Sequence, residues 1–426
     1  MKNTSFVLKG DIIFNSAPNQ LEAFRNGYLV CVDGISQGVF DHIPDEYREL
    51  PLLDHSDQLI IPGLTDLHVH APQYTFRSVG LDMELLDWLN TYTFPEESRY
   101  ADMDYADTAY RRFVHDMVHS PNTRGCLFAT LHVDATVKLM DLLEEAGLCT
   151  MVGKVNMDRN GNPKLEEENA EASRDATLAW LKAIDGRYQH TKPIITPRFI
   201  PSCSDELMHM LSKIRKDHGL AVQSHLSENK GEIAWVQELC PNSTGYGDAY
   251  DQFSLFGGEN CPTIMAHCVW SDDAEVELMR KNGVYVAHCP ASNSNLASGI
   301  APIRRYMNAG VHVGLGSDVA GGTHLSLLRA MSDAIQVSKL CWRLMDETLA
   351  PLSIAEAFWL GSMGSGSFFG KVGSFLPGYE CDIVVIDDTR YNPHGPEDVA
   401  VRLERTIYLS EDRDITHKFV QGRQLF

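Results

Sequence analysis

The pattern of apolar and polar residues changes twice along the chain. In the N-terminal part, up to about Leu59, short apolar runs alternate with polar residues and are separated by proline, asparagine and glycine turn signals, which is typical of strands. The middle part alternates short apolar runs with longer segments of helical period, the pattern of repeated strand–helix units. Beyond about Lys371 the chain is strand-like again. These changes predict a central α/β domain at residues 62–370 and a small β-sandwich domain that combines residues 1–61 with residues 371–426.

Eight apolar runs in the middle part are candidate strands. They are residues 60–68, 125–132, 148–157, 193–200, 219–225, 263–268, 283–288 and 311–317. Eight strands that alternate with helices fit a closed (β/α)8, or TIM, barrel. An open doubly wound sheet is the structural alternative, but it gives no reason for polar residues at the ends of so many strands. In a barrel those C-terminal ends converge on one site, and we therefore predict the barrel.

Histidines and acids stand at the ends of these runs. In "HVHAPQY" (residues 68–74), His68 and His70 point to the same side because side chains alternate along a strand. Other runs end in His225, with Glu228 three residues later, in His267 and in Asp318. Each residue alone would equally fit a core histidine or a helix cap. Together, three imidazoles and a carboxylate suit Zn²⁺ with a water molecule, although Fe²⁺ or Mn²⁺ accept the same ligands.

Composition narrows the classes of partner. The chain has 426 residues, of which 44% are hydrophobic, so it can bury a large core. Its net charge of -22 repels nucleic acid and anionic membranes, and no run is apolar enough to span a bilayer. Ten scattered cysteines without a C-x-x-C pair, and a start that lacks signal-peptide features, favour a cytoplasmic protein with reduced thiols. We expect a small-molecule substrate.

Two groups of motifs carry a resemblance to a known family. "PGLTDLHVH" (residues 62–70) and "GSFLPGYECD" (residues 373–382) resemble segments of many amidohydrolases. "HAPQY" (residues 70–74), "YTFPEE" (residues 92–97) and "TPRF" (residues 196–199) resemble the guanine deaminases within that superfamily. The resemblance extends over nearly the whole chain and implies the same barrel with a small β-domain. The other known route to base deamination uses H-x-E with P-C-x-x-C, and this motif is absent from the sequence.

The resemblance also implies a ligand set. Matched residue by residue, the metal ligands of the family fall on His68, His70, His225 and Asp318, and His267 matches a histidine beside the metal-bound water. Binuclear members carry a carboxylated lysine at the end of the fourth strand, where this chain has "IITPRF". One metal ion per chain, most simply Zn²⁺, is therefore expected. Lys154 lies one strand earlier and is interpreted as structural.

The implied reaction is the hydrolytic removal of the C2 amino group of guanine, which gives xanthine and ammonia. The residues suit this chemistry, because Asp318 can accept a proton from the attacking water and Glu228 can protonate a ring nitrogen beside C2. His267 can orient or stabilise the attacking oxygen. For recognition, Gln73 can donate and accept hydrogen bonds on the guanine edge, and Arg198 can donate to O6.

Further implied features complete the hypothesis. Phe199 would pack on the purine plane, and Asn293 would support the site from behind. Residues 81–97, with Trp88 and Phe94 as buried contacts, form either a lid over the mouth or an ordinary amphipathic helix. The resemblance suggests a homodimer. Two alternatives stay open: another amino- or chloro-substituted purine, pterin or triazine as substrate, and a non-catalytic barrel used for binding.

Overall fold

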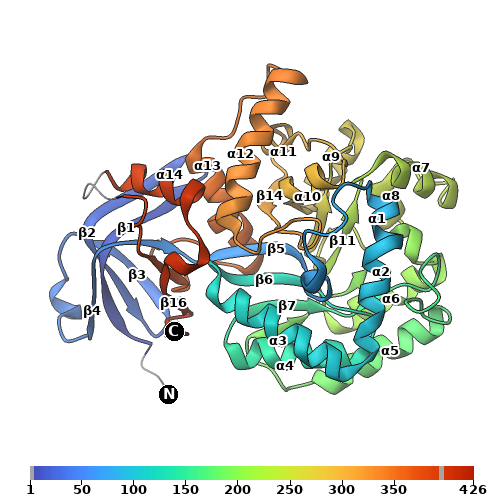
Figure 1. Cartoon of the computed structure of the whole chain (residues 1–426), viewed down its shortest axis with the longest axis horizontal. Helices are drawn as coiled ribbons and strands as arrows, with labels where there is room; N and C mark the ends of the chain where they lie inside the picture. Colours follow the sequence, from blue (N-terminus) through green and yellow to red (C-terminus); the bar gives the residue numbers. More distant parts are fainter. Residues whose placement is uncertain (1–3, 393–397) are drawn as a thin grey trace.

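The computed structural model describes residues 4–392 and 398–426 and consists of a barrel with a smaller sheet beside it (Figure 1). The sheet is built from both ends of the chain, in blue and red, and the barrel from the middle. Within the described residues, no helix is both long and apolar enough to cross a membrane.

The smaller sheet contains seven strands in the order β17-β16-β15-β4-β1-β2-β3. Their bounds are β1 (Phe6–Ala17), β2 (Gln20–Val32), β3 (Ile35–Phe40), β4 (Leu52–Pro62), β15 (Ile383–Ile386), β16 (Ile415–Val420) and β17 (Arg423–Gln424). β1 and β16 are three strand positions apart, about 14 Å in a flat sheet. The ring centroids of Phe6 and Phe419 on these two strands are nevertheless 5.2 Å apart. The sheet therefore curls around its own apolar core, so the two layers of the expected sandwich are parts of one hydrogen-bonded sheet.

The barrel has the eight strand positions that the apolar runs predict. Its strands are β5 (Leu64–His70), β6 (Asn122–Phe128), β7 (Cys149–Gly153), β9 (Thr191–Pro193), β11 (Val222–Leu226), β12 (Thr263–His267), β13 (Tyr285–His288) and β14 (His312–Leu315). They pair in parallel as two four-stranded sheets, and a short pair, β8 (Val155–Asn156) with β10 (Thr196–Pro197), extends the third and fourth positions. The fourth strand is interrupted because Pro193 and Pro197 cannot donate to a ladder.

Backbone hydrogen bonds join the two half-barrels. On one side, Ile195 bridges to Val222 and so connects the fourth strand position to β11. On the other side, the amide of Asp318 donates to the carbonyl of His68 at 2.8 Å, and the amide of His70 donates to the carbonyl of Val319 at 3.1 Å. The chain after β14 is therefore bound to the end of β5, and the side chains at these two strand ends are brought together.

Helices surround the barrel (Figure 1). The longer ones are α3 (Met103–His119), α4 (Val133–Ala146), α5 (Ala170–Ile184), α6 (Asp205–His218), α7 (Lys230–Leu239), α9 (Asp273–Asn282) and α12 (Leu327–Leu344). Shorter ones are α1 (Leu85–Trp88), α2 (Phe94–Glu97), α8 (Tyr246–Asp251), α10 (Pro290–Asn295), α11 (Ile303–Ala309) and α13 (Ile354–Trp359). α6 illustrates how the sequence sets the ends of a helix. The Ser204 side chain caps its first turn, and Gly219, at φ +64°, ends it in a left-handed conformation.

The two parts are held together by buried charged groups. Arg124 on β6 donates to Asp382 at 2.6 Å, and the Lys418 ammonium on β16 donates to the carbonyl oxygens of Met117 and Ser120 at the end of α3. Between β15 and β16 the chain also forms α14 (Val399–Leu409), a helix within the part that the sequence pattern describes as strand-like.

Candidate metal centre and active-site pocket

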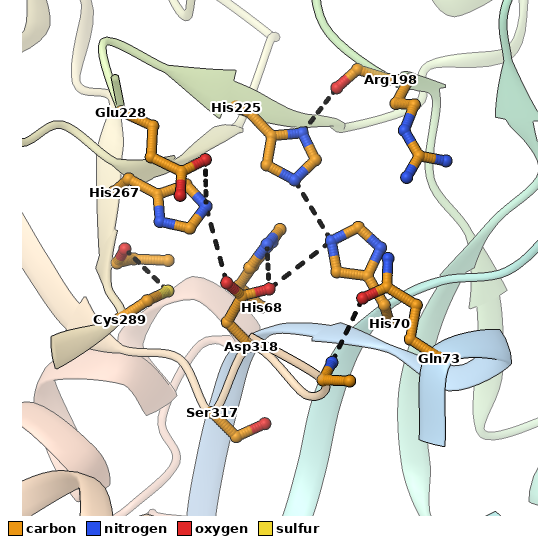
Figure 2. Close-up of polar contacts among 12 residues, drawn as sticks. His68, His70, Gln73, Arg198, His225, Glu228, His267, Cys289, Ser317 and Asp318 are labelled. Atoms are coloured by element: carbon orange, nitrogen blue, oxygen red, sulfur yellow. Dashed lines mark hydrogen bonds and ion pairs between the residues drawn. The ribbon is translucent and has the colours of Figure 1, made fainter. Parts of the chain in front are cut away.

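Five polar side chains converge at the C-terminal ends of the barrel strands (Figure 2). His68 and His70 come from β5, His225 from β11 and His267 from β12, while Asp318 follows β14. All are at least largely buried, at 5% exposure or less apart from the partly buried His225. The structure thus brings together the strand-end residues that the sequence singles out.

The tautomer of His225 follows from its neighbour. Its Nδ1 lies 2.6 Å from the backbone carbonyl oxygen of Arg198, which can only accept, so Nδ1 carries the proton. The Nε2 lone pair of His225 then faces Nε2 of His70 at 3.2 Å. Burial holds the pKa of both imidazoles well below the ordinary value, so both rings are neutral. Two facing nitrogens in a buried place suit a shared cation.

His68 and Asp318 complete the same cluster. Nε2 of His68 is 3.1 Å from Oδ1 of Asp318, and Nε2 of His70 is 3.6 Å from the same oxygen. The contact between Nε2 of His68 and Asp318 lacks hydrogen-bond geometry, so this buried nitrogen remains without a hydrogen bond and could bind a metal ion. Burial raises the pKa of Asp318, but the neighbouring imidazoles outweigh burial and hold this pKa well below its usual range. Three neutral imidazoles and one carboxylate therefore form a donor set that fits a divalent metal.

His267 differs from the other three histidines. Burial lowers its pKa, but Glu228 and Asp318 outweigh burial and raise the pKa above the ordinary value. Its Nε2 is 3.4 Å from Oε2 of Glu228 and 3.8 Å from Oδ2 of Asp318, and its Nδ1 lies 2.9 Å from Oδ1 of Asn293. A protonated His267 can donate to an oxygen between these two acids. His267 thus lies within reach of both acids and also at the edge of the same cluster of metal-binding side chains.

Glu228 is a buried acid with an unusual pKa. Burial raises its pKa to about 7, against the opposing effects of His267 and of a hydrogen bond from Ser298, whose hydroxyl donates to Oε1 at 3.0 Å. A carboxyl group that titrates near neutrality can both release and recover a proton, as general acid–base catalysis requires. The carboxylate of Glu232 accepts the backbone amide of Glu228 at 3.1 Å and so fixes the loop.

A pocket opens directly onto this cluster. Gln73, Arg198 and Phe199, the three residues expected to recognise a substrate, all line it together with Glu228. Figure 2 shows Glu228 and His267 on one side of the cluster and Arg198 and Gln73 on the other. A ligand in this pocket would therefore lie between an acid–base group and a set of hydrogen-bond donors.

The segment around α1 and α2 covers the pocket. Leu85, Trp88 and Leu89 line the cavity, and the indole of Trp88 donates to the carbonyl of Val79 at 2.9 Å. Phe94, on α2, lies under the guanidinium of Arg198, with its ring centroid 4.9 Å away. The segment therefore forms a wall of the pocket.

Nothing in the sequence identifies two further residues at the site, Glu97 and Ser298, as functional. Glu97 accepts hydrogen bonds from both Gln73 and Arg198, although "YTFPEE" gives no indication of which acid faces inward. Ser298 reaches Glu228 from a loop 70 residues later in the chain. Lys154, by contrast, forms a buried ion pair with Glu167 and donates to the carbonyl of Val155, which agrees with a structural role.

Comparisons with known proteins extend over the whole chain. A model of the amidohydrolase family matches residues 59–425. The chain is 33% identical to the guanine deaminase of Dictyostelium discoideum, with 98% of each chain covered. The crystal structure of guanine deaminase from C. acetobutylicum, with guanine bound in its active site, is similar with a TM-score of 0.96 and 44% identity, over 99% of this chain and 100% of that one. Guanine deaminase of E. coli is similar with a TM-score of 0.86 and 30% identity, over 99% of each chain.

Proposed function

This chain belongs to the amidohydrolase family, and we propose on that premise that it is a guanine aminohydrolase, which converts guanine and water into xanthine and ammonia. The observation that carries this conclusion is the close likeness, over essentially the full length, to a guanine deaminase that holds guanine in its active site. The buried His and Asp cluster with an acid of pKa about 7 beside it supplies the chemistry that hydrolysis of a C–N bond needs. Release of xanthine from guanine by the purified, metal-loaded protein tests the proposal.

We propose that His68, His70, His225 and Asp318 hold one divalent metal ion per chain, with Zn²⁺ as the first candidate and Fe²⁺ as the second. When bound, such an ion lowers the pKa of a water molecule toward neutrality. The donor set supports this proposal, because three imidazoles are neutral and one nitrogen lacks a hydrogen-bond partner.

The protein's own groups then move the protons. Asp318 accepts a proton from the attacking water as its oxygen bonds to C2, and His267 donates a hydrogen bond to that oxygen. Glu228 gives its proton to a ring nitrogen beside C2. When the C2–N bond breaks, the proton held by Asp318 goes to the leaving amino group, and the hydroxyl proton on C2 returns to Glu228. Ammonia then departs, C2 carries the carbonyl of xanthine, and both acids are back in their starting states. The distances of His267 to both acids, 3.4 and 3.8 Å, support this division of roles.

We assign the recognition of guanine to the side of the pocket that carries Arg198 and Gln73. Arg198 donates to O6 of guanine, Gln73 pairs with the ring edge, and Phe199 packs on the purine plane. Adenine carries an amino group in place of O6, so it would leave these buried donors without an acceptor. We therefore expect adenine to be rejected.

Removal of the Arg198 side chain should chiefly damage substrate binding. Arg198→Ala deletes a donor to O6 but leaves Glu228 and the histidine cluster in place, so the KM for guanine should rise about tenfold or more. Steady-state kinetics on protein with verified metal content measures this. An unchanged KM would argue against the contact between Arg198 and O6.

The acid–base role of Glu228 predicts a shift in pH dependence. The Ser298 hydrogen bond lowers the pKa of Glu228 because it stabilises the ionised carboxylate, so Ser298→Ala should raise this pKa further. If the protonated acid is the active form, activity is present below the pKa and is lost as pH rises through it. The alkaline limb of the kcat profile should therefore move up by about one pH unit in Ser298→Ala.

A matched control is available four residues earlier, on α10. Ser294→Ala removes a hydroxyl that donates only to the carbonyl of Pro290, and its pH profile should coincide with that of the parent protein. An alkaline limb that does not move in Ser298→Ala would mean that another group controls activity at high pH.

We propose a cytoplasmic homodimer that acts in purine catabolism, and a division into a barrel at residues 62–370 and a composite domain from residues 1–61 and 371–426. All ten cysteines are free thiols, and nine of them are buried, which fits a reducing compartment.

A further inference from the structure

We propose that Glu97 is a positioning residue that fixes the hydrogen-bond donors of Gln73 and Arg198 for the carbonyl edge of the substrate. The proposal rests on the proposed function, in which these two side chains recognise guanine. Glu97 ends α2, on the segment that also provides the Trp88 wall of the pocket. Its carboxylate lies behind Gln73 and Arg198, which themselves line the cavity.

One buried carboxylate receives three hydrogen bonds. Nε2 of Gln73 donates to Oε1 of Glu97 at 2.8 Å, while Nη1 and Nη2 of Arg198 donate to Oε2 and Oε1 at 2.5 and 3.1 Å. Gln73, Glu97 and Arg198 are each 3% exposed or less. A buried ion pair with this bidentate geometry strongly limits the rotation of both side chains.

The orientation of the Gln73 amide follows from this arrangement. A carboxylate only accepts, so the amide nitrogen must face Glu97. The amide oxygen then accepts the backbone amide of Ala320 at 3.2 Å. Because both ends are fixed, one N–H and one oxygen lone pair remain for the pocket. Glu97 and the Ala320 amide together select one of the two flipped states of Gln73, and with it the pattern of donors and acceptors that a ligand meets.

Arg198 needs the same carboxylate for an electrostatic reason. Guanine is neutral, so the substrate brings no charge to balance a buried guanidinium. The guanidinium also lies close to the proposed metal site, because Arg198 and His70 line the same pocket. Without Glu97, an unbalanced cation would face both a neutral ligand and the proposed metal site. With Glu97, the hydrogens of Arg198 that point away from the ion pair can donate to a carbonyl oxygen.

The neighbouring acid provides a matched control. Glu96 points to the opposite side, where it accepts hydrogen bonds from Thr75 at 2.6 Å and from Tyr105 on α3. Glu96→Gln therefore changes the same charge, one residue away, without contact to Gln73 or Arg198. A loss of function from altered net charge or from a loosened segment would occur in both variants.

The test compares Glu97→Gln, Glu97→Asp and Glu96→Gln, each made as the full chain and assayed for metal content and thermal unfolding. Calorimetry then measures affinity for hypoxanthine, which carries the O6 carbonyl, and for purine, which lacks it. Binding without turnover separates this proposal from the proposed function, because the parent protein could bind hypoxanthine even if it failed to deaminate guanine. Glu97→Asp keeps the negative charge that balances Arg198, so this variant should fold even if Glu97→Gln does not. The aspartate side chain is shorter and cannot reach both Gln73 and Arg198.

We expect both Glu97 variants to bind hypoxanthine about 10- to 100-fold more weakly, with a clearly smaller loss for purine, which has the ring edge that meets Gln73 but no O6 for Arg198. The KM for guanine should rise by the same factor at unchanged metal content, and Glu96→Gln should match the parent protein. Equal weakening for purine and hypoxanthine, an unchanged affinity for hypoxanthine, or no binding of hypoxanthine to the parent protein would each overturn the proposal.

Discussion

Replacement of Glu228 by glutamine is expected to lower the kcat for guanine about 10³-fold and to leave the metal content unchanged. Glutamine has the same shape and can still accept the hydroxyl of Ser298, so the fold around it should persist. It cannot release a proton near pH 7, whereas burial gives Glu228 a pKa of about 7. The loss therefore reports the missing proton transfer rather than a distorted pocket.

Single-turnover kinetics with guanine, together with elemental analysis of the same sample, measures this effect. Glu238→Gln, an exposed substitution on α7, is the matched control and should retain full activity. If Glu228→Gln turned over guanine at the parental rate, the acid–base role of Glu228 would be wrong, and Asp318 or His267 would have to supply the proton.

Loss of one proposed metal ligand should have a comparable or larger effect. His70→Ala removes the nitrogen that faces His225 at 3.2 Å, so a divalent ion would lose one of its four protein ligands. Without the ion, the pKa of the attacking water returns to its high bulk value, and we expect kcat to fall by about 10⁴-fold or more. Metal content should fall in parallel.

His324→Ala controls for the loss of an imidazole, because His324 is exposed and lies in the loop after Asp318. Removal of metal from the parent protein with a chelator, followed by reloading with Zn²⁺ or Fe²⁺, should abolish and then restore turnover. Full metal content with unchanged activity in His70→Ala would show that the ion lies elsewhere in the cluster.

The fold follows the apolar pattern closely, and the departures have physical causes. The eight runs correspond to eight strand positions, and the predicted α/β barrel and family are confirmed. Pro193 and Pro197 interrupt the fourth strand, which a hydrophobicity pattern alone does not resolve. The strand-like interpretation of residues 371–426 is wrong at α14, where Val399, Leu403 and Ile407 recur every four residues and form the buried face of a helix. This short helical period lies between strand-like runs on both sides, which dominate the pattern of the segment.

The strand-end residues could be found from the sequence because a barrel brings C-terminal strand ends together. The contacts of Glu97 could not be found from the sequence. Between α1 and α2 the chain forms a π-helical turn at Leu89–Thr93, which shifts the helical register, so 3.6-residue periodicity does not tell which of Glu96 and Glu97 faces inward. Ser298 reaches Glu228 by a loop contact that no spacing rule describes.

Deamination of guanine by means of a metal ion held at the strand ends can be measured directly. The most direct test incubates the purified, fully metal-loaded protein with guanine and follows xanthine and ammonia by chromatography. We expect one xanthine and one ammonia for each guanine consumed, and no product from adenine. No xanthine from guanine, with one metal ion per chain verified in the same sample, would contradict this expectation.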